Sequence, residues 1–133
     1  IYGCDDCLAA CPWNKFAQNA QEVRLHARDS LKSPRLTELL ALDDPSFRAL
    51  FTKSPIKRIG RDRFIRNVLH AAGNSGDPSL AAQVEALIHD PAPVVRGTAI
   101  WALRKLAPQR AEALKALFLD TESDETVKAE WRA

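Results

Sequence analysis

A repeat with a spacing of thirty residues is the feature that most constrains how this chain can fold. Shifting the sequence by thirty places puts residues 64–71, FIRNVLHA, onto residues 94–101, VVRGTAIW. The two segments share an arginine at their third position, and their apolar positions largely coincide. A weaker copy, TVKA, begins at Thr126, thirty-two places further on. Repeats of this length are typical of stacked helical pairs, because one pair cannot bury its own apolar face.

Apolar residues recur at helical spacing through most of the chain, and no useful stretch alternates as a β-strand requires. The pattern predicts helices over 61–73, 80–88, 94–106 and 113–118, and from 126 to the end. Earlier helix starts are indicated by Pro34, Asp44-Pro45 and Ser54-Pro55. The segment HDPAPVVRGTAIWAL resembles the HEAT-repeat signature of an acidic turn, Val-Arg and small apolar residues. The predicted fold class is therefore all-α, a HEAT-like helical solenoid that residues 36–60 cap.

The length of 133 residues suits one ordinary domain, or a small domain with an attached fragment. No apolar run approaches the ~20 residues that cross a membrane, and no signal-peptide pattern opens the chain. The net charge of +2 hides a local excess of basic residues between positions 53 and 66, where Asp62 is the one acid. The basic residues of this segment are Lys53, Lys57, Arg58, Arg61, Arg63 and Arg66. Such a concentration predicts an electrostatic contact with a partner.

All three cysteines lie near the start of the chain, at Cys4, Cys7 and Cys11. With Pro12 they match the last three positions of the bacterial ferredoxin run C-x2-C-x2-C-x3-C-P. In that run, neighbouring thiolates bind one cluster and the cysteine before proline binds another. The spacing therefore predicts that Cys4 and Cys7 bind one [4Fe–4S] cluster and Cys11 a second. Because neither ligand set is complete, we expect the missing thiolates upstream of residue 1 and the chain to be the C-terminal piece of a longer protein.

Three other interpretations of the cysteines stay open. A zinc site would need a second Cys/His pair, and the nearest histidine, His26, is irregularly spaced. A redox disulfide usually lies in a β-α context, which this sequence lacks. Incidental buried cysteines are not excluded by count alone. Trp13, next to the cysteines, is a candidate for shielding a cluster from water, whereas Trp101 and Trp131 are interpreted as packing residues.

The segments YGCDDCLAACPWN and KRIGRDRFIRNVLHAAGNSGD, with the HEAT-like tail, resemble the C-terminal third of the epoxyqueuosine reductase family. That family comprises cobalamin-dependent enzymes with two [4Fe–4S] clusters that complete queuosine in the anticodon loop of tRNA. The resemblance implies two regions: residues 1–30 end the ferredoxin-like iron–sulfur domain and form a connector, and residues 31–133 form a HEAT-like tRNA-binding domain. It also implies that the cobalamin pocket and the general acid lie outside this chain, which therefore holds no catalytic residue.

The resemblance assigns ligand roles within the cysteine segment. Cys4 and Cys7 match thiolates of the cluster nearer the cobalamin, and Cys11 matches the thiolate that completes the other cluster. Asp5 and Asp6 fall where the family's backbone approaches the corrin of cobalamin. A solvated acidic turn is the alternative interpretation of these two residues.

The resemblance also places a tRNA contact at Lys57, Arg58, Arg61, Arg63, Arg66 and Asn67. The residues themselves point the same way, since Arg63, Arg66 and His70 share one stripe of a helix over 61–73. A cationic stripe can follow phosphates, and guanidinium planes can stack on unpaired bases. A solvated charged face is the alternative. Arg96, by contrast, is expected to pair with a turn carboxylate such as Asp90.

The sequence thus predicts the C-terminal part of an enzyme that reduces epoxyqueuosine to queuosine, with clusters relaying single electrons to cobalamin. The expected partners are the tRNA anticodon stem-loop and an electron donor such as a flavodoxin or a ferredoxin, and the expected state is a cytoplasmic monomer without membrane contact. The rival is a ferredoxin-type electron-transfer module fused to a HEAT-like protein-interaction domain, whose basic helix docks an acidic partner. A reductive-dehalogenase-like relative is a third reading, against which the HEAT-like tail argues.

Overall fold

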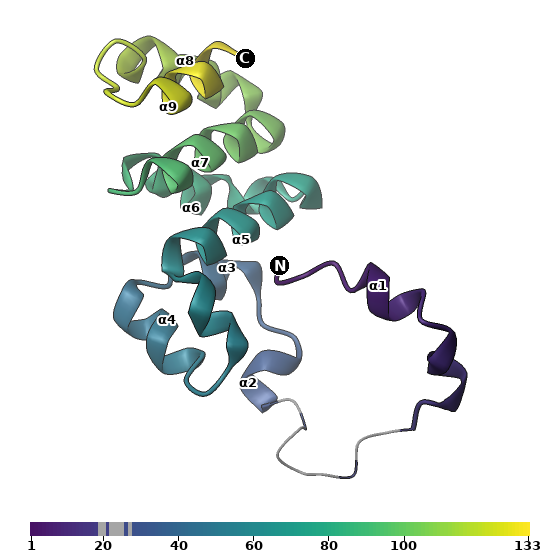
Figure 1. The fold of residues 1–133 in the computed structure, drawn as a ribbon. Coiled ribbons are helices and arrows are strands. Elements are labelled where there is room, and N and C mark those ends of the chain that lie inside the picture. The colour runs from purple at the N-terminus through teal and green to yellow at the C-terminus, as the bar shows by residue number, and fades with distance from the viewer. Residues whose placement is uncertain (19–20, 22–25, 27) are drawn as a thin grey trace.

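The computed structural model describes residues 1–18, 21, 26 and 28–133, and the regular structure of these residues is entirely helical. An arm formed by residues 1–18 carries α1 (Asp6–Ala9) and a 3-10 helix (Pro12–Phe16). The arm touches the stack of helices that follows residue 28 at its first residues and then extends away from it (Figure 1). The connector expected over residues 15–35 lies partly outside the described residues. None of the helices described is long and apolar enough to span a membrane.

The first helices of the stack are short and cover one end of it (Figure 1). They are α2 (Asp29–Lys32), α3 (Leu36–Leu40), α4 (Asp44–Leu50) and a 3-10 helix (Pro55–Ile59). The predicted helix starts at Asp44-Pro45 and Ser54-Pro55 are confirmed. Asp43 caps α4 because its carboxylate accepts a hydrogen bond from the Ser46 N–H at 2.8 Å. Hydrogen bonds from the side chain and the backbone of Ser46 lower the pKa of the Asp43 carboxyl.

Five helices build the repeats. They are α5 (Arg61–Ser75), α6 (Ala81–Ala86), α7 (Pro93–Leu106), α8 (Pro108–Phe118) and α9 (Glu125–Arg132). The second helices of successive pairs, α5, α7 and α9, lie side by side, and α6 and α8 pack against α7 as the other layer (Figure 1). The all-α, HEAT-like arrangement predicted from the thirty-residue repeat is confirmed.

Within the repeats, helix boundaries differ from the sequence prediction by two residues or more in three helices, whereas α7 and α9 each begin one residue earlier than expected. The helix expected over 80–88 is α6 with a 3-10 turn at each end, at Pro78–Leu80 and Leu87–His89. The helix expected over 113–118 begins earlier, at Pro108, because proline is tolerated in a first helical turn. The helix expected over 61–73 continues to Ser75 and ends at Gly76, which has a φ of +68°.

The core lies between the two layers and between successive second helices. The apolar face of α5 and that of α7 are fully buried against one another, with Ile65, Val68, Leu69, Val95, Ala99 and Leu103 at 0% exposure. Gly73 allows the closest approach of these helices, since a Cβ there would lie 2.6 Å from Trp101 Cζ3 and 3.0 Å from Ala102 Cα. The tight packing fixes which face of α5 and of α7 remains exposed.

Candidate nucleic-acid interface and cysteine segment

The predicted tRNA-contact residues lie on the 3-10 helix Pro55–Ile59 and on the first turns of α5. Gly60, with a φ of +78°, joins the two helices, so their charged side chains lie within one short region. Lys57, Arg58 and Arg63 are exposed, and none of the three has an ion pair or hydrogen bond with another side chain in the described part of the chain. These cations are therefore available to an anionic partner.

Arg61 differs from its basic neighbours because its guanidinium is largely buried. Its Nη1 lies 2.5 Å from Asp90 Oδ2, and its Nε donates to the Leu42 carbonyl at 3.0 Å. The Arg61 side chain is 14% exposed and that of Asp90 only 4%. Arg61 thus connects α5 to the segment after α3 and to the turn before α7. Its predicted tRNA contact stays a prediction, but its observed contacts are those of a structural residue.

Arg66 and Asn67 form a small polar group beside the start of the arm. Arg66 donates from Nε and Nη2 to Asn67 Oδ1, at 3.1 and 2.9 Å. The Asn67 Nδ2 donates to the carbonyl of Ile1 at 2.6 Å. Arg66 therefore has a neutral partner rather than a carboxylate, and Asn67 joins the basic helix to the segment that carries the cysteines. No pattern along the chain predicts this contact between residues so far apart.

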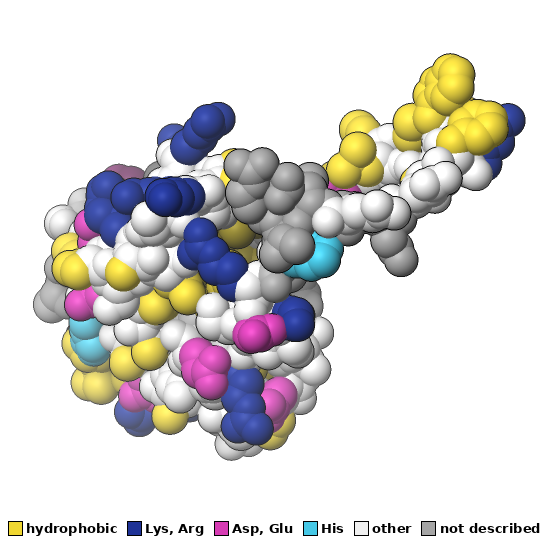
Figure 2. Space-filling model, turned by 90° about the horizontal axis from the view of Figure 1, so that it is seen from below, with side chains coloured by type: hydrophobic (Ala, Val, Ile, Leu, Met, Phe, Trp, Pro, Cys, Tyr) yellow, Lys and Arg dark blue, Asp and Glu magenta, His cyan; other side chains and the backbone are white. Residues whose placement is uncertain are grey.

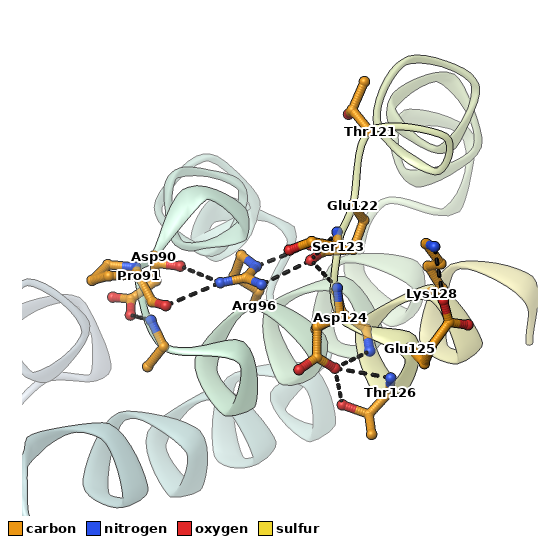
Figure 3. A network of polar contacts seen from close by, with 12 residues as sticks. Asp90, Pro91, Arg96, Thr121, Glu122, Ser123, Asp124, Glu125, Thr126 and Lys128 are labelled. Atoms are coloured by element: carbon orange, nitrogen blue, oxygen red, sulfur yellow. Dashed lines mark hydrogen bonds and ion pairs between the residues drawn. The ribbon is translucent and has the colours of Figure 1, made fainter.

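Arg96 lies at the centre of the polar network drawn in Figure 3. It donates to both carboxylate oxygens of Glu122, at 3.0 and 2.8 Å, and to the carbonyls of Asp90 and Pro91, each at 3.1 Å. The hydrogen bond from Arg96 is the main cause that lowers the pKa of Glu122, and the same bond raises the pKa of Arg96.

The structural role predicted for Arg96 and its pairing with a turn carboxylate are confirmed, but that carboxylate is Glu122 and not Asp90. Arg96 reaches only the main-chain carbonyl of Asp90, because the Asp90 carboxylate is taken by Arg61 and by the N–H of Ala92 at 2.9 Å. Glu122, in the turn before α9, supplies the carboxylate instead. The boundary between α5 and α7 and that between α7 and α9 thus each have a largely buried arginine–carboxylate pair.

The three cysteines are free thiols on the arm. Cys4 and Cys7 are exposed, and Cys11 is half-buried. Thiolates at this spacing suit iron–sulfur clusters in kind. The three thiolates are too few to complete a cluster. Among the described residues there is no group of three or more His, Cys, Asp or Glu side chains close enough to hold a metal ion. A cluster bound by this chain would need further ligands.

Other residues of the arm are exposed as well. Asp5, which precedes α1, has a left-handed backbone with a φ of 58°, and Asp6 begins that helix. The side chains of Leu8, Trp13 and Phe16 are 66%, 72% and 62% exposed. Figure 2 shows hydrophobic side chains gathered at the tip of the arm, whereas Lys and Arg side chains gather on the body. The proposed shielding of a cluster by Trp13 stays a prediction.

Comparisons with known proteins agree with this geometry. The HEAT-repeat family profile matches residues 60–132. An epoxyqueuosine reductase of Xanthomonas campestris pv. campestris is 41% identical over 104 residues, which are 77% of this chain and 29% of that enzyme. The epoxyqueuosine reductase of Pseudomonas aeruginosa is 36% identical over 108 residues, or 79% of this chain and 29% of the relative.

Solved structures of epoxyqueuosine reductases have the same fold over nearly all of this chain. The enzyme of Bacillus subtilis superposes with a TM-score of 0.88 and 31% identity, covering 98% of this chain and 36% of that one. A crystal structure of an epoxyqueuosine reductase with an epoxyqueuosine-modified tRNA-Tyr stem loop gives a TM-score of 0.88, 31% identity and coverage of 98% and 35%. The chain therefore spans about a third of the length of these relatives, and the resemblance predicted from its motifs is confirmed.

Proposed function

The chain belongs to the HEAT-repeat family, and from that premise we propose that it is the C-terminal, tRNA-binding and cluster-ligating part of an epoxyqueuosine reductase. The observation that carries the proposal is the group of unpaired cations at the start of α5. Lys57, Arg58 and Arg63 are exposed without a carboxylate partner among the residues described. Cations of this kind bind RNA by neutralising phosphates and releasing counterions.

The similarity to a tRNA-bound enzyme supports this proposal. The reductase solved with a modified tRNA stem loop superposes on 98% of this chain. In our proposal Lys57, Arg58, Arg63 and Arg66 contact the anticodon stem-loop, and guanidinium planes stack on its unpaired bases. Asn67 holds Arg66 in place by accepting two of its N–H groups. Arg61 contributes by fixing the start of α5 against the next repeat.

The arm supplies thiolates in the same proposal. Cys4 and Cys7 are ligands of one [4Fe–4S] cluster and Cys11 is a ligand of a second, with the remaining ligands from other parts of the enzyme. When bound, the clusters supply single-electron transfer toward cobalamin. Asp5 and Asp6 are proposed to face the corrin. The proposal includes a cytoplasmic monomer that receives electrons from a flavodoxin or a ferredoxin.

The cysteine roles are tested by metal analysis of the intact enzyme. Iron and acid-labile sulfide are expected in amounts that fit two clusters, and Cys11→Ser should lower both by about half. Cys4→Ser should have an effect of similar size on the other cluster. Stoichiometric zinc without sulfide would contradict the iron–sulfur assignment.

The tRNA role is tested by reversing charges on α5 in the intact enzyme. Arg63→Glu should weaken binding of the anticodon stem-loop, and the double variant with Arg66→Glu should abolish it. The logarithm of the wild-type affinity should fall with the logarithm of salt concentration by about 0.7 per phosphate contacted in single-stranded RNA. Arg110→Gln is the control, because it removes one charge on α8 in the other layer, where Arg110 pairs with Glu85 instead of lying unpaired. Unchanged affinity in the double variant would contradict the proposed tRNA contact and would favour an acidic protein as the partner of the basic face.

A further inference from the structure

A second group of cationic and aromatic side chains lies on α7, beside the basic face of α5. The ring of His70, on α5, meets the ring of Trp101, on α7, edge-on with a centroid distance of 4.9 Å and an interplanar angle of 69°. Lys105 Nζ lies 5.0 Å from the centroid of the same indole ring. His70 and Lys105 are exposed and Trp101 is half-buried. The three side chains thus form one continuous surface across two repeats.

The position of this group is fixed by the packing of α5 against α7. The indole of Trp101 lies where Gly73 has no side chain, since a Cβ at residue 73 would come within 2.6 Å of Trp101 Cζ3. A fixed indole restricts the ammonium of Lys105, because a cation is attracted to the face of an aromatic ring. Lys105 is therefore held near the surface of α7 by Trp101, whose ring also contacts His70, rather than extending freely into solvent.

The charge around this group favours an anionic partner. Helix α7 contains no Asp or Glu, and Asp62 is the one acidic residue of α5. A hollow of about 440 Å³ beside Trp101 is lined by Lys105, Arg104 and Lys115. One acidic side chain, Glu112, also lines it, and this carboxylate lies 3.8 Å from Lys115 Nζ. Lys105 has no carboxylate partner within the described residues.

On the basis of the proposed function, we propose that the RNA-binding surface continues from α5 onto α7, where Lys105 contacts a phosphate of the RNA stem. The contact between His70 and Trp101 makes the two exposed faces continuous. Packed helices lie about 8–10 Å apart, and a duplex strand carries one phosphate per about 3.4 Å of axis. Along its helix, Lys105 lies nine residues beyond Arg96, the repeat counterpart of Arg66, which adds about 13 Å at ~1.5 Å per residue. Lys105 is therefore placed to reach a phosphate several nucleotides from those contacted by α5. Trp101 is a positioning residue for that contact.

The test compares two variants that each remove one positive charge from the intact enzyme. Lys105→Gln alters the α7 surface, and Arg110→Gln alters α8 in the other layer. Binding of a labelled anticodon stem-loop is titrated between about 0.05 and 0.2 M salt, where counterion release strongly changes affinity. Lys105→Gln should lower the slope of log affinity against log salt by about 0.7 to 0.9 and weaken binding at low salt about five- to tenfold. Arg110→Gln should leave the slope unchanged.

Two further measurements separate the contact from structural effects and from the proposed function. Trp101→Phe, which keeps an aromatic face, should bind as the wild type does, whereas Trp101→Leu should lower the slope, with urea unfolding recorded for both. A stem-loop shortened by several base pairs should bind wild type and Lys105→Gln equally. If Arg63→Glu lowers the slope and Lys105→Gln does not, the extension onto α7 is wrong and the proposed function stands. If neither changes the slope, the tRNA role of this face itself is wrong.

Discussion

Arg66 and Arg96 occupy the same position in two successive repeats, yet their guanidinium groups have different surroundings. Arg96 donates to both oxygens of Glu122 and to two main-chain carbonyls, so its hydrogen-bonding capacity is nearly used. Arg66 donates to one neutral oxygen, the Oδ1 of Asn67. Arg96 holds two repeats together, whereas Arg66 keeps an uncompensated charge at the surface. Sequence identity at a repeat position therefore does not imply an identical role.

The structural counterpart of Arg96 is Arg61. Arg61 pairs with Asp90 in the turn before α7, and Arg96 pairs with Glu122 in the turn before α9. In both repeats an arginine of the second helix thus bonds a carboxylate that leads into the next second helix. Because Arg61 takes this role five residues before Arg66, Arg66 is left free for the exposed face of α5.

The largest expected effect is that of Arg61→Met on stability. The substitution leaves the Asp90 carboxylate, only 4% exposed, without its cation. Removing one partner of a buried pair costs about 3 kcal/mol of unfolding free energy. Urea unfolding measures the loss, and Arg66→Met is the matched control with an expected change of about 0.5 kcal/mol or less. Equal losses in the two variants would remove the distinction between these arginines.

The second prediction concerns Glu122→Gln, which weakens the other repeat boundary. At neutral pH the substitution should lower the free energy of unfolding by about 2 kcal/mol, since the charged acceptor of the Arg96 hydrogen bonds is lost. The folded-state pKa of Glu122 lies below its ordinary value of 4.5, chiefly because Arg96 donates to the carboxylate. The stabilisation is therefore fully present above about pH 4.5 and is lost as the pH falls through the folded-state pKa.

Unfolding of the wild type and Glu122→Gln at a series of pH values checks this prediction. The difference in unfolding free energy should be constant near neutral pH and should shrink below about pH 4. A difference that stayed constant down to pH 2 would mean that the carboxylate charge contributes nothing. Glu125→Gln is the control at an exposed position, where solvent screens the single surface ion pair and its loss should change stability little.

The third prediction concerns RNA binding, for which Arg66, the control in the first prediction, is expected to matter most. Arg66→Met should weaken binding of the tRNA stem-loop to the intact enzyme about tenfold, which corresponds to about 1.4 kcal/mol for one lost charged contact. Arg96→Met should leave the salt dependence of RNA binding unchanged while lowering the unfolding free energy. Fluorescence anisotropy titrations and urea unfolding of both variants give the four values needed. Parallel losses of affinity in both would show that the repeat as a whole, rather than Arg66, determines RNA binding.

The fold could be predicted from the sequence because its determinants are local. Apolar spacing, prolines at helix starts and the thirty-residue repeat are all visible along the chain, and α5 and α7 follow them closely. The 3-10 turns around α6 could not be predicted from apolar spacing, which does not distinguish a 3-10 turn from an α-helical one, although the turn Leu87–His89 packs against α7. The start of α8 at Pro108 was missed because proline ends a preceding helix and also suits a first helical turn.

The residues of the candidate site could be predicted from the sequence, but which of them are structural and which are free to bind a partner could not. The basic segment was evident, yet nothing local distinguished Arg61 from Arg63, two residues away. The distinction arises from Asp90, which is distant in sequence and reaches Arg61 only through the stacking of α5 and α7. The same stacking gave Arg96 a different carboxylate from the one expected. Pairings between repeats depend on the rotation of each helix about its axis, which periodicity fixes only roughly.

The smallest predicted effect concerns the contact between the two parts of the molecule. Asn67→Ala removes the hydrogen bond to the Ile1 carbonyl and the acceptor of Arg66. One hydrogen bond contributes about 1 kcal/mol, so the arm should be released more often while the helical stack stays folded. Protease cleavage within residues 1–18 should become faster, and Asn74→Ala, which alters an exposed asparagine on the same helix, should leave the cleavage rate unchanged.

Arg66→Met should keep the arm attached, because the Asn67 Nδ2 that bonds Ile1 remains. If Arg66→Met instead releases the arm as Asn67→Ala does, the basic face and the arm are coupled through the guanidinium, and the free role assigned to Arg66 is incorrect.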